Sequence, residues 1–194
     1  MATRKMFGLK HDSIVILLMF WVFSAYAQAA KKTDYQEIEW IQLMPKEDLA
    51  ALLNPPEFLL DIQDGSEQDS VEALSALTDQ DEATRRFQQA LTSEKVIENF
   101  DKKAIRIPGF VVPLKSDEQQ RVTEFFIVPY FGACLHMPPP PPNQMIYGTT
   151  KTGFELAQLT EPFWFEGVIN IATTSNMTGT AVYGLALDNI EAYN

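Results

Sequence analysis

The chain has 194 residues and a formal net charge of −11, and hydrophobic residues make up 46% of it. The length is enough for one domain with a core, and the hydrophobic content is ordinary for a globular fold. The negative charge argues against nucleic acid and anionic lipid as partners and favours cationic ones, although solubility alone also explains it.

The first 27 residues have the pattern of a secretory signal peptide. Three basic residues precede Ile14–Phe23, a run of ten apolar residues, and small alanines follow it. Ten apolar residues are too few to cross a bilayer, which takes roughly 20. We therefore expect cleavage after Ala27 or Ala29, no stable membrane span afterwards and a periplasmic location. An uncleaved N-terminal anchor is the alternative.

Removal of residues 1–27 takes away three basic residues and one acidic residue, so the net charge becomes −13. It also leaves Cys134 and His136 as the only cysteine and the only histidine. A single cysteine forms no internal disulfide. In an oxidising compartment it is therefore buried, bound to metal, catalytic or paired with another chain.

Residues 28–100 predict a helical portion with an acidic arm. Residues 46–53 place three leucines on one helical face, with acids near the start and Asn54-Pro55-Pro56 as the stop. Asp61–Thr84 holds eight acids and no base, which indicates a solvated arm with some helix around Ser70–Leu77. The spacing of apolar residues in 81–91 then predicts an amphipathic helix.

Residues 101–194 read as β-structure. Five segments have strand composition, and Gly109 marks a bulge or bend in the first; the segments are 103–114, 121–129, 143–150, 162–172 and 179–190. We expect an α+β fold in which a small five-stranded antiparallel β-barrel of the oligonucleotide/oligosaccharide-binding (OB) type carries the N-terminal helices in one globular domain. An open antiparallel sheet packed by those helices is the alternative.

Cys134 and His136 are two residues apart, beside a run of prolines. In an extended segment such side chains project to the same side, so a thiolate and an imidazole can approach one zinc ion. Zinc normally takes four ligands, and Glu124 on the preceding strand is our candidate for a third. The pair equally suits thiol catalysis, with Asn143 or Gln144 orienting the histidine. An inert buried thiol is the third interpretation.

The five prolines of Pro138–Pro142 predict a polyproline II rod about 15 Å long. Such a rod is either a strap that fixes the loop or a ligand for a partner, and the flanking aromatics Tyr130, Phe131 and Tyr147 favour the strap. The residues predicted to meet a partner are Pro138, Pro139, Pro140, Pro141, Pro142 and Asn143.

The motif TEFFIVPYFGACLHMPPPPPNQ, with RIPGFVVPL before it and PFWFEG and AVYGLALDNIEAY after it, resembles an uncharacterised bacterial family of exported proteins, domain of unknown function 3299. The resemblance runs from about Trp40 to the C-terminus. It implies no established activity. Members are often encoded beside an envelope ABC transporter and a periplasmic metal-binding protein, which implies a role in zinc uptake or homeostasis.

We therefore expect a non-enzymatic accessory protein for transition-metal handling, with zinc held by Cys134, His136 and Glu124. Components of an ABC transporter or a periplasmic metal-binding protein are the expected partners. One alternative is a thiol enzyme that uses Cys134 and His136. The other is a metal-free interaction module that docks through Pro138–Pro142.

Overall fold

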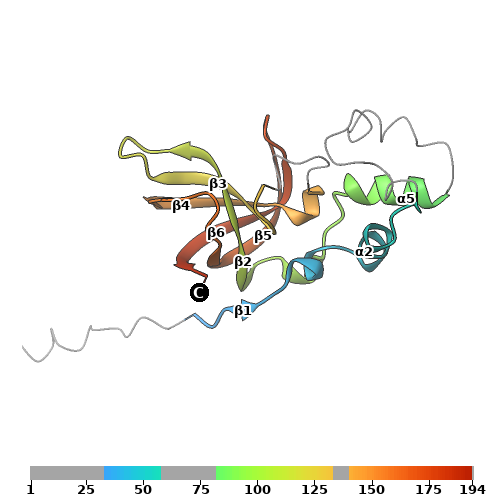
Figure 1. The fold of residues 1–194 in the computed structure, drawn as a ribbon. Helices are drawn as coiled ribbons and strands as arrows, with labels where there is room; N and C mark the ends of the chain where they lie inside the picture. The colour runs from blue at the N-terminus through green and yellow to red at the C-terminus, as the bar shows by residue number, and fades with distance from the viewer. Residues whose placement is uncertain (1–32, 58–81, 133–139, 194) are drawn as a thin grey trace, which may run out of the picture. The chain divides into compact units, whose positions relative to one another are not determined.

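The computed structural model describes residues 33–57, 82–132 and 140–193, and Figure 1 shows their arrangement. Asp34–Asn194 form one compact unit. The leader and the helix predicted around Ser70–Leu77 lie outside the described residues. In the part of the chain that is described, no helix has the length and apolar character needed to cross a membrane.

Five strands close into the predicted barrel. They are β2 (Lys103–Ser116), β3 (Val122–Val128), β4 (Ile146–Phe154), β5 (Phe163–Ser175) and β6 (Thr180–Ala192). Their order is β2-β3-β4-β6-β5, and pairing of β5 with β2 closes the ring. A sixth strand, β1 (Gln36–Glu37), adds to β2 in parallel.

The barrel is mixed, whereas the sequence analysis expected antiparallel pairing throughout. β4 and β6 run parallel, and the other four pairs of the ring are antiparallel. The odd number of strands explains the parallel pair. Strand directions can alternate all the way round a closed ring only if the number of strands is even, so five strands require one parallel pair.

Gly109, where the sequence predicted a bulge or bend, is where β2 changes partners. Lys103–Gly109 pair with β5, and Phe110 begins the pairing with β3. A Cβ atom at Gly109 would lie 2.7 Å from Ile127 Cγ2 and 2.9 Å from the Val128 carbonyl oxygen. Only glycine fits this close approach of the two strands.

Both predicted helices form, as α2 (Lys46–Leu53) and α5 (Glu82–Leu91), and they pack against each other (Figure 1). The buried side of α2 differs from the leucine face that the sequence suggested. Asp48 is 5% exposed, whereas Leu53 is 70% exposed. Two partners that follow α5 in the chain hold Asp48 inside, as described below.

The hydrophobic core fills the barrel, and a second cluster covers part of its outer surface. Neighbouring residues of a strand point to opposite faces. On β3, Phe125 and Ile127 belong to the interior cluster, and Phe126 and Val128 belong to the other. All four are fully buried. The outer face of β3 is therefore part of the packed structure.

The buried hydroxyl of Tyr183 ties the N-terminal portion to the barrel. It donates a hydrogen bond to the Leu43 carbonyl (2.9 Å) and accepts one from the Ile97 backbone N–H (2.6 Å). The indole N–H of Trp40 adds a second tie by donating to the Pro108 carbonyl on β2 (2.6 Å). Backbone groups before α2 and after α5 thus depend on side chains for their hydrogen bonds.

We predict that Tyr183→Phe lowers the free energy of unfolding by about 1–3 kcal/mol, because two buried backbone groups lose their partner. Denaturant unfolding measures the change. Tyr193→Phe is the matched control, since Tyr193 is 47% exposed and should tolerate the loss of its hydroxyl. Equal stability of the two variants would contradict the role given to Tyr183.

The burial of the Tyr183 hydroxyl also predicts how stability depends on pH. Burial raises the pKa of Tyr183 above its ordinary value, and the hydrogen bond from Ile97 opposes this rise. A group whose pKa is higher in the folded state than in the unfolded state contributes its full stabilisation of the fold at pH values below the unfolded pKa. That stabilisation is lost as the pH rises through the folded pKa. The stability difference between wild type and Tyr183→Phe should stay constant up to about pH 10 and shrink above it. Shrinkage already near neutral pH would contradict this assignment.

Candidate functional site

The predicted site lies in the connection between β3 and β4, and the structure describes its two ends. Cys134, His136, Pro138 and Pro139 fall within 133–139, outside the described residues. The description covers the chain as far as Gly132 and again from Pro140. Whether Cys134 and His136 converge on one point therefore stays a prediction.

The N-terminal side of this connection is aromatic. The ring of Phe131 lies 6.3 Å from that of Phe110 on the outer face of β2. Tyr130 and Phe131 remain 49% and 46% exposed. Gly132 follows with a φ of +77°, a conformation that favours glycine. This side thus combines a contact to the barrel with apolar surface left open to solvent.

The C-terminal side is built into the fold. Pro140 and Pro141 are buried, and Pro142–Gln144 form the 3₁₀ helix η4. Asn143 and Gln144 are buried as well; the Asn143 side-chain amide donates to the Lys95 carbonyl (3.1 Å).

The Gln144 amide donates to the Trp40 carbonyl (2.9 Å). The side chains of Asn143 and Gln144 therefore both bind backbone carbonyls of the N-terminal portion. Among the residues predicted to meet a partner, Pro140, Pro141 and Asn143 are enclosed by their own chain, as a strap requires.

Glu124 lies near the start of β3, about 13 Å along the strand from Val128 at its end. One carboxylate oxygen accepts from the Tyr147 hydroxyl (2.8 Å) and the other from Lys115 Nζ (3.0 Å). The bond from Tyr147, followed by that from Lys115, lowers the pKa of Glu124, whereas burial raises that of Tyr147. Each carboxylate oxygen of Glu124 thus already accepts one hydrogen bond within the chain.

Within the described ranges, no group of three or more His, Cys, Asp or Glu side chains is arranged to hold a metal ion.

The aromatic segment at the start of β5 is engaged within the chain. The guanidinium of Arg106 lies 4.3 Å from the Trp164 ring centroid, and the ring of Tyr193 lies 5.0 Å from that of Trp164. Arg106 also forms ion pairs with Glu37, Glu166 and Glu191. These contacts tie the start of β5 to β2 and to the C-terminal end of the chain.

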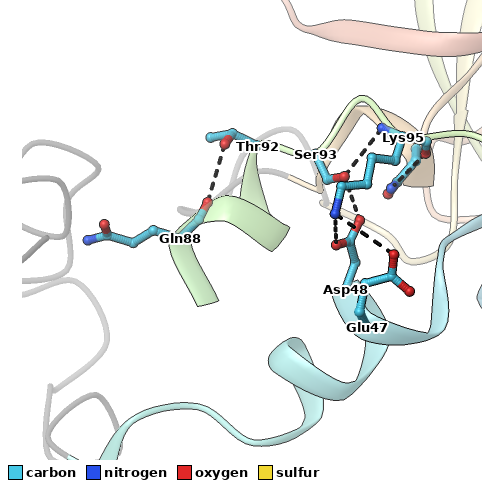
Figure 2. A network of polar contacts seen from close by, with 7 residues as sticks. Glu47, Asp48, Gln88, Thr92, Ser93 and Lys95 are labelled. Atoms are coloured by element: carbon cyan, nitrogen blue, oxygen red, sulfur yellow. Dashed lines mark hydrogen bonds and ion pairs between the residues drawn. The ribbon is translucent and has the colours of Figure 1, made fainter. Parts of the chain in front are cut away.

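The sequence analysis missed a polar cluster beside α2. Figure 2 shows Asp48 facing Ser93 and Lys95, which follow α5. Ser93 Oγ donates to one Asp48 oxygen (2.5 Å), and Lys95 Nζ donates to the other (3.2 Å). A hollow of about 700 Å³ between α2 and α5 borders Asp48 and Lys95. No local pattern marks these contacts, because Asp48 is 45 and 47 positions away from its partners.

A family model described as a protein of unknown function (DUF3299) matches residues 40–192, most of the chain. The chain belongs to the DUF3299 family. A solved structure of a DUF3299 family protein from Pseudomonas aeruginosa PAO1 is similar to it, with 29% identity and a TM-score of 0.59. The similarity covers 84% of this chain and 98% of that one. No curated protein matches this DUF3299 chain.

We predict that Tyr147→Phe raises the pKa of Glu124 toward its ordinary value, because the larger of the two stabilising hydrogen bonds is lost. Titration of the carboxyl carbon by NMR measures the pKa. Lys115→Met is the comparison and should also raise the pKa of Glu124, because it removes a hydrogen bond and a positive charge. No change in Tyr147→Phe would show that the hydroxyl does not hold the carboxylate.

Proposed function

We propose that this protein is a periplasmic, non-enzymatic accessory protein of transition-metal handling that works alongside an envelope ABC transporter. In this proposal Cys134 and His136 bind zinc, and the leader of residues 1–27 is removed on export. The observation that carries the proposal is the anchoring of the connection between β3 and β4. Phe131 packs on the barrel before the pair, and Asn143 and Gln144 are buried after it.

Anchoring matters because it restricts how far two ligands can move apart. A thiolate and an imidazole held in a short connection lose less conformational entropy on binding a metal than they would in a free tail. Zinc accepts both donor types at about 2.3 Å for sulfur and about 2.1 Å for nitrogen. The overall negative charge of the chain favours cations at its surface.

The remaining zinc ligands come from outside the pair. Glu124 is the candidate on the same chain, and its two carboxylate oxygens already accept hydrogen bonds from Tyr147 and Lys115. Water or a transport partner is the other source. A site completed by a partner would suit transfer of the metal, since zinc with an open position exchanges ligands more readily than a closed four-ligand site.

The interaction module is the second candidate function. The exposed surfaces of Tyr130 and Phe131 favour it, because exposed aromatics beside a rigid proline segment are typical of docking surfaces. Here Cys134→Ser would leave function intact, whereas Tyr130→Ser and Phe131→Ser would weaken binding to the partner.

The thiol enzyme is the third candidate. Asn143 suits the orienting role, because its Oδ1 has no hydrogen-bond partner among the described residues. A reactive thiolate predicts fast alkylation of Cys134 by iodoacetamide near neutral pH, slowed in Asn143→Ala and His136→Ala. A slow reaction in the wild type would remove this candidate.

For the metal proposal, we predict one zinc per chain in the purified protein, lost in both Cys134→Ser and His136→Ala. Metal analysis and competition titration with a chelator measure stoichiometry and affinity. Glu124→Gln tests the third ligand: weaker binding supports it, and unchanged binding assigns the position to water or a partner. No specific metal in the wild type would overturn the proposal.

A further inference from the structure

Asp48 occupies an unusual position for a charged residue. It lies in the first turn of α2, yet it is 5% exposed. One of its oxygens accepts from Ser93 Oγ and the other from Lys95 Nζ, at the two ends of the Ser93–Lys95 segment (Figure 2). Ser93 Oγ also accepts from the Lys95 backbone N–H (3.3 Å), so Asp48 fixes the backbone of this segment as well as its side chains.

The same segment holds the turn that ends the connection between β3 and β4. The Lys95 carbonyl accepts the hydrogen bond from the Asn143 amide, which is the one hydrogen bond of the Asn143 side chain among the described residues. Asn143 is fully buried, and its Oδ1 has no partner there. The orientation of Asn143 therefore depends on where the Lys95 carbonyl lies.

We propose that Asp48 is a positioning residue that sets the geometry of η4, through Ser93, Lys95 and Asn143. The side chain of Lys95 is 60% exposed, so its own packing does not fix this segment. After Lys95, Val96 packs against the core and the Ile97 N–H bonds to Tyr183. Before Lys95, the Ser93 N–H bonds to the Ala90 carbonyl, and Asp48 supplies the side-chain restraint through Ser93 Oγ.

This inference goes beyond the proposed function, because it holds whether or not a metal binds. It joins α2 to the C-terminal anchor of the Cys134–His136 connection by bonds between described residues. Asp48 and Lys95 also border the hollow between α2 and α5. A change in the spacing of these two helices would therefore act on the bonds that position η4.

The rate of hydrogen exchange at the Gln144 and Met145 amides directly measures how stably η4 is held. In the structure they donate to the Pro141 and Pro142 carbonyls, at 2.7 and 3.4 Å. Asp48→Asn should speed their exchange by about tenfold, because charge-assisted hydrogen bonds that hold the segment are weakened. The amides of Phe125–Ile127 on β3 serve as the reference, and their exchange relative to global unfolding should not change.

Glu47→Gln is the matched control. It removes the same charge from the neighbouring position, 3.9 Å from Lys95 Nζ, but Glu47 is exposed and makes no bond to Ser93. It should leave the exchange of Gln144 and Met145 as in the wild type. If Glu47→Gln speeds the exchange of these amides as much as Asp48→Asn does, the loss of a negative charge alone explains the effect, and the proposal is overturned.

Ser93→Ala is a second variant, milder than Asp48→Asn, and it provides the test if Asp48→Asn fails to fold. It should speed exchange at Gln144 and Met145 in the same direction, and its effect should largely vanish when Asn143 is already replaced by alanine. Additive effects of Ser93→Ala and Asn143→Ala, or a uniform increase over turn and barrel alike, would contradict a positioning role.

Discussion

The structure depends on the buried hydroxyl of Tyr183, which pairs with the Leu43 carbonyl and the Ile97 backbone N–H. Leu43 is 140 positions before it in the chain and Ile97 is 86 positions before it. A tyrosine inside the barrel thereby connects the segment before α2 with the segment after α5. Leaving either backbone group unpaired in a dry core would cost more than one ordinary hydrogen bond contributes, so the N-terminal portion and the barrel form one structure.

The strands could be predicted because their signals are local. Strand composition placed all five segments of the barrel, and the spacing of apolar residues, with a proline stop after the first, placed both helices. The mixed pairing also followed in principle from the number of strands. The burial of Asp48 did not, because periodicity shows which residues share a helical face but not what that face meets. Its partners, Ser93 and Lys95, are distant in sequence and have no motif.

For the candidate site, too, the sequence predicted some features and not others. Residue types alone identified Cys134 and His136 as unusual, and proline content suggested a strap. What the sequence could not give is how the ends of this connection are held. The structure supplies that at its C-terminal end, where Asn143 and Gln144 use their side-chain amides to bind carbonyls of Lys95 and Trp40. The connection thus begins on an aromatic contact and ends on a buried polar one, which is consistent with a short segment held for binding.

X-ray absorption at the zinc edge of the purified, zinc-loaded protein tests the central claim most directly. Our account predicts one sulfur at about 2.3 Å and at least one nitrogen at about 2.1 Å around the metal. The sulfur should be absent in Cys134→Ser, since Cys134 is the sole cysteine of the chain. A coordination shell without sulfur in the wild type would contradict the account and leave the anchored connection as a docking element.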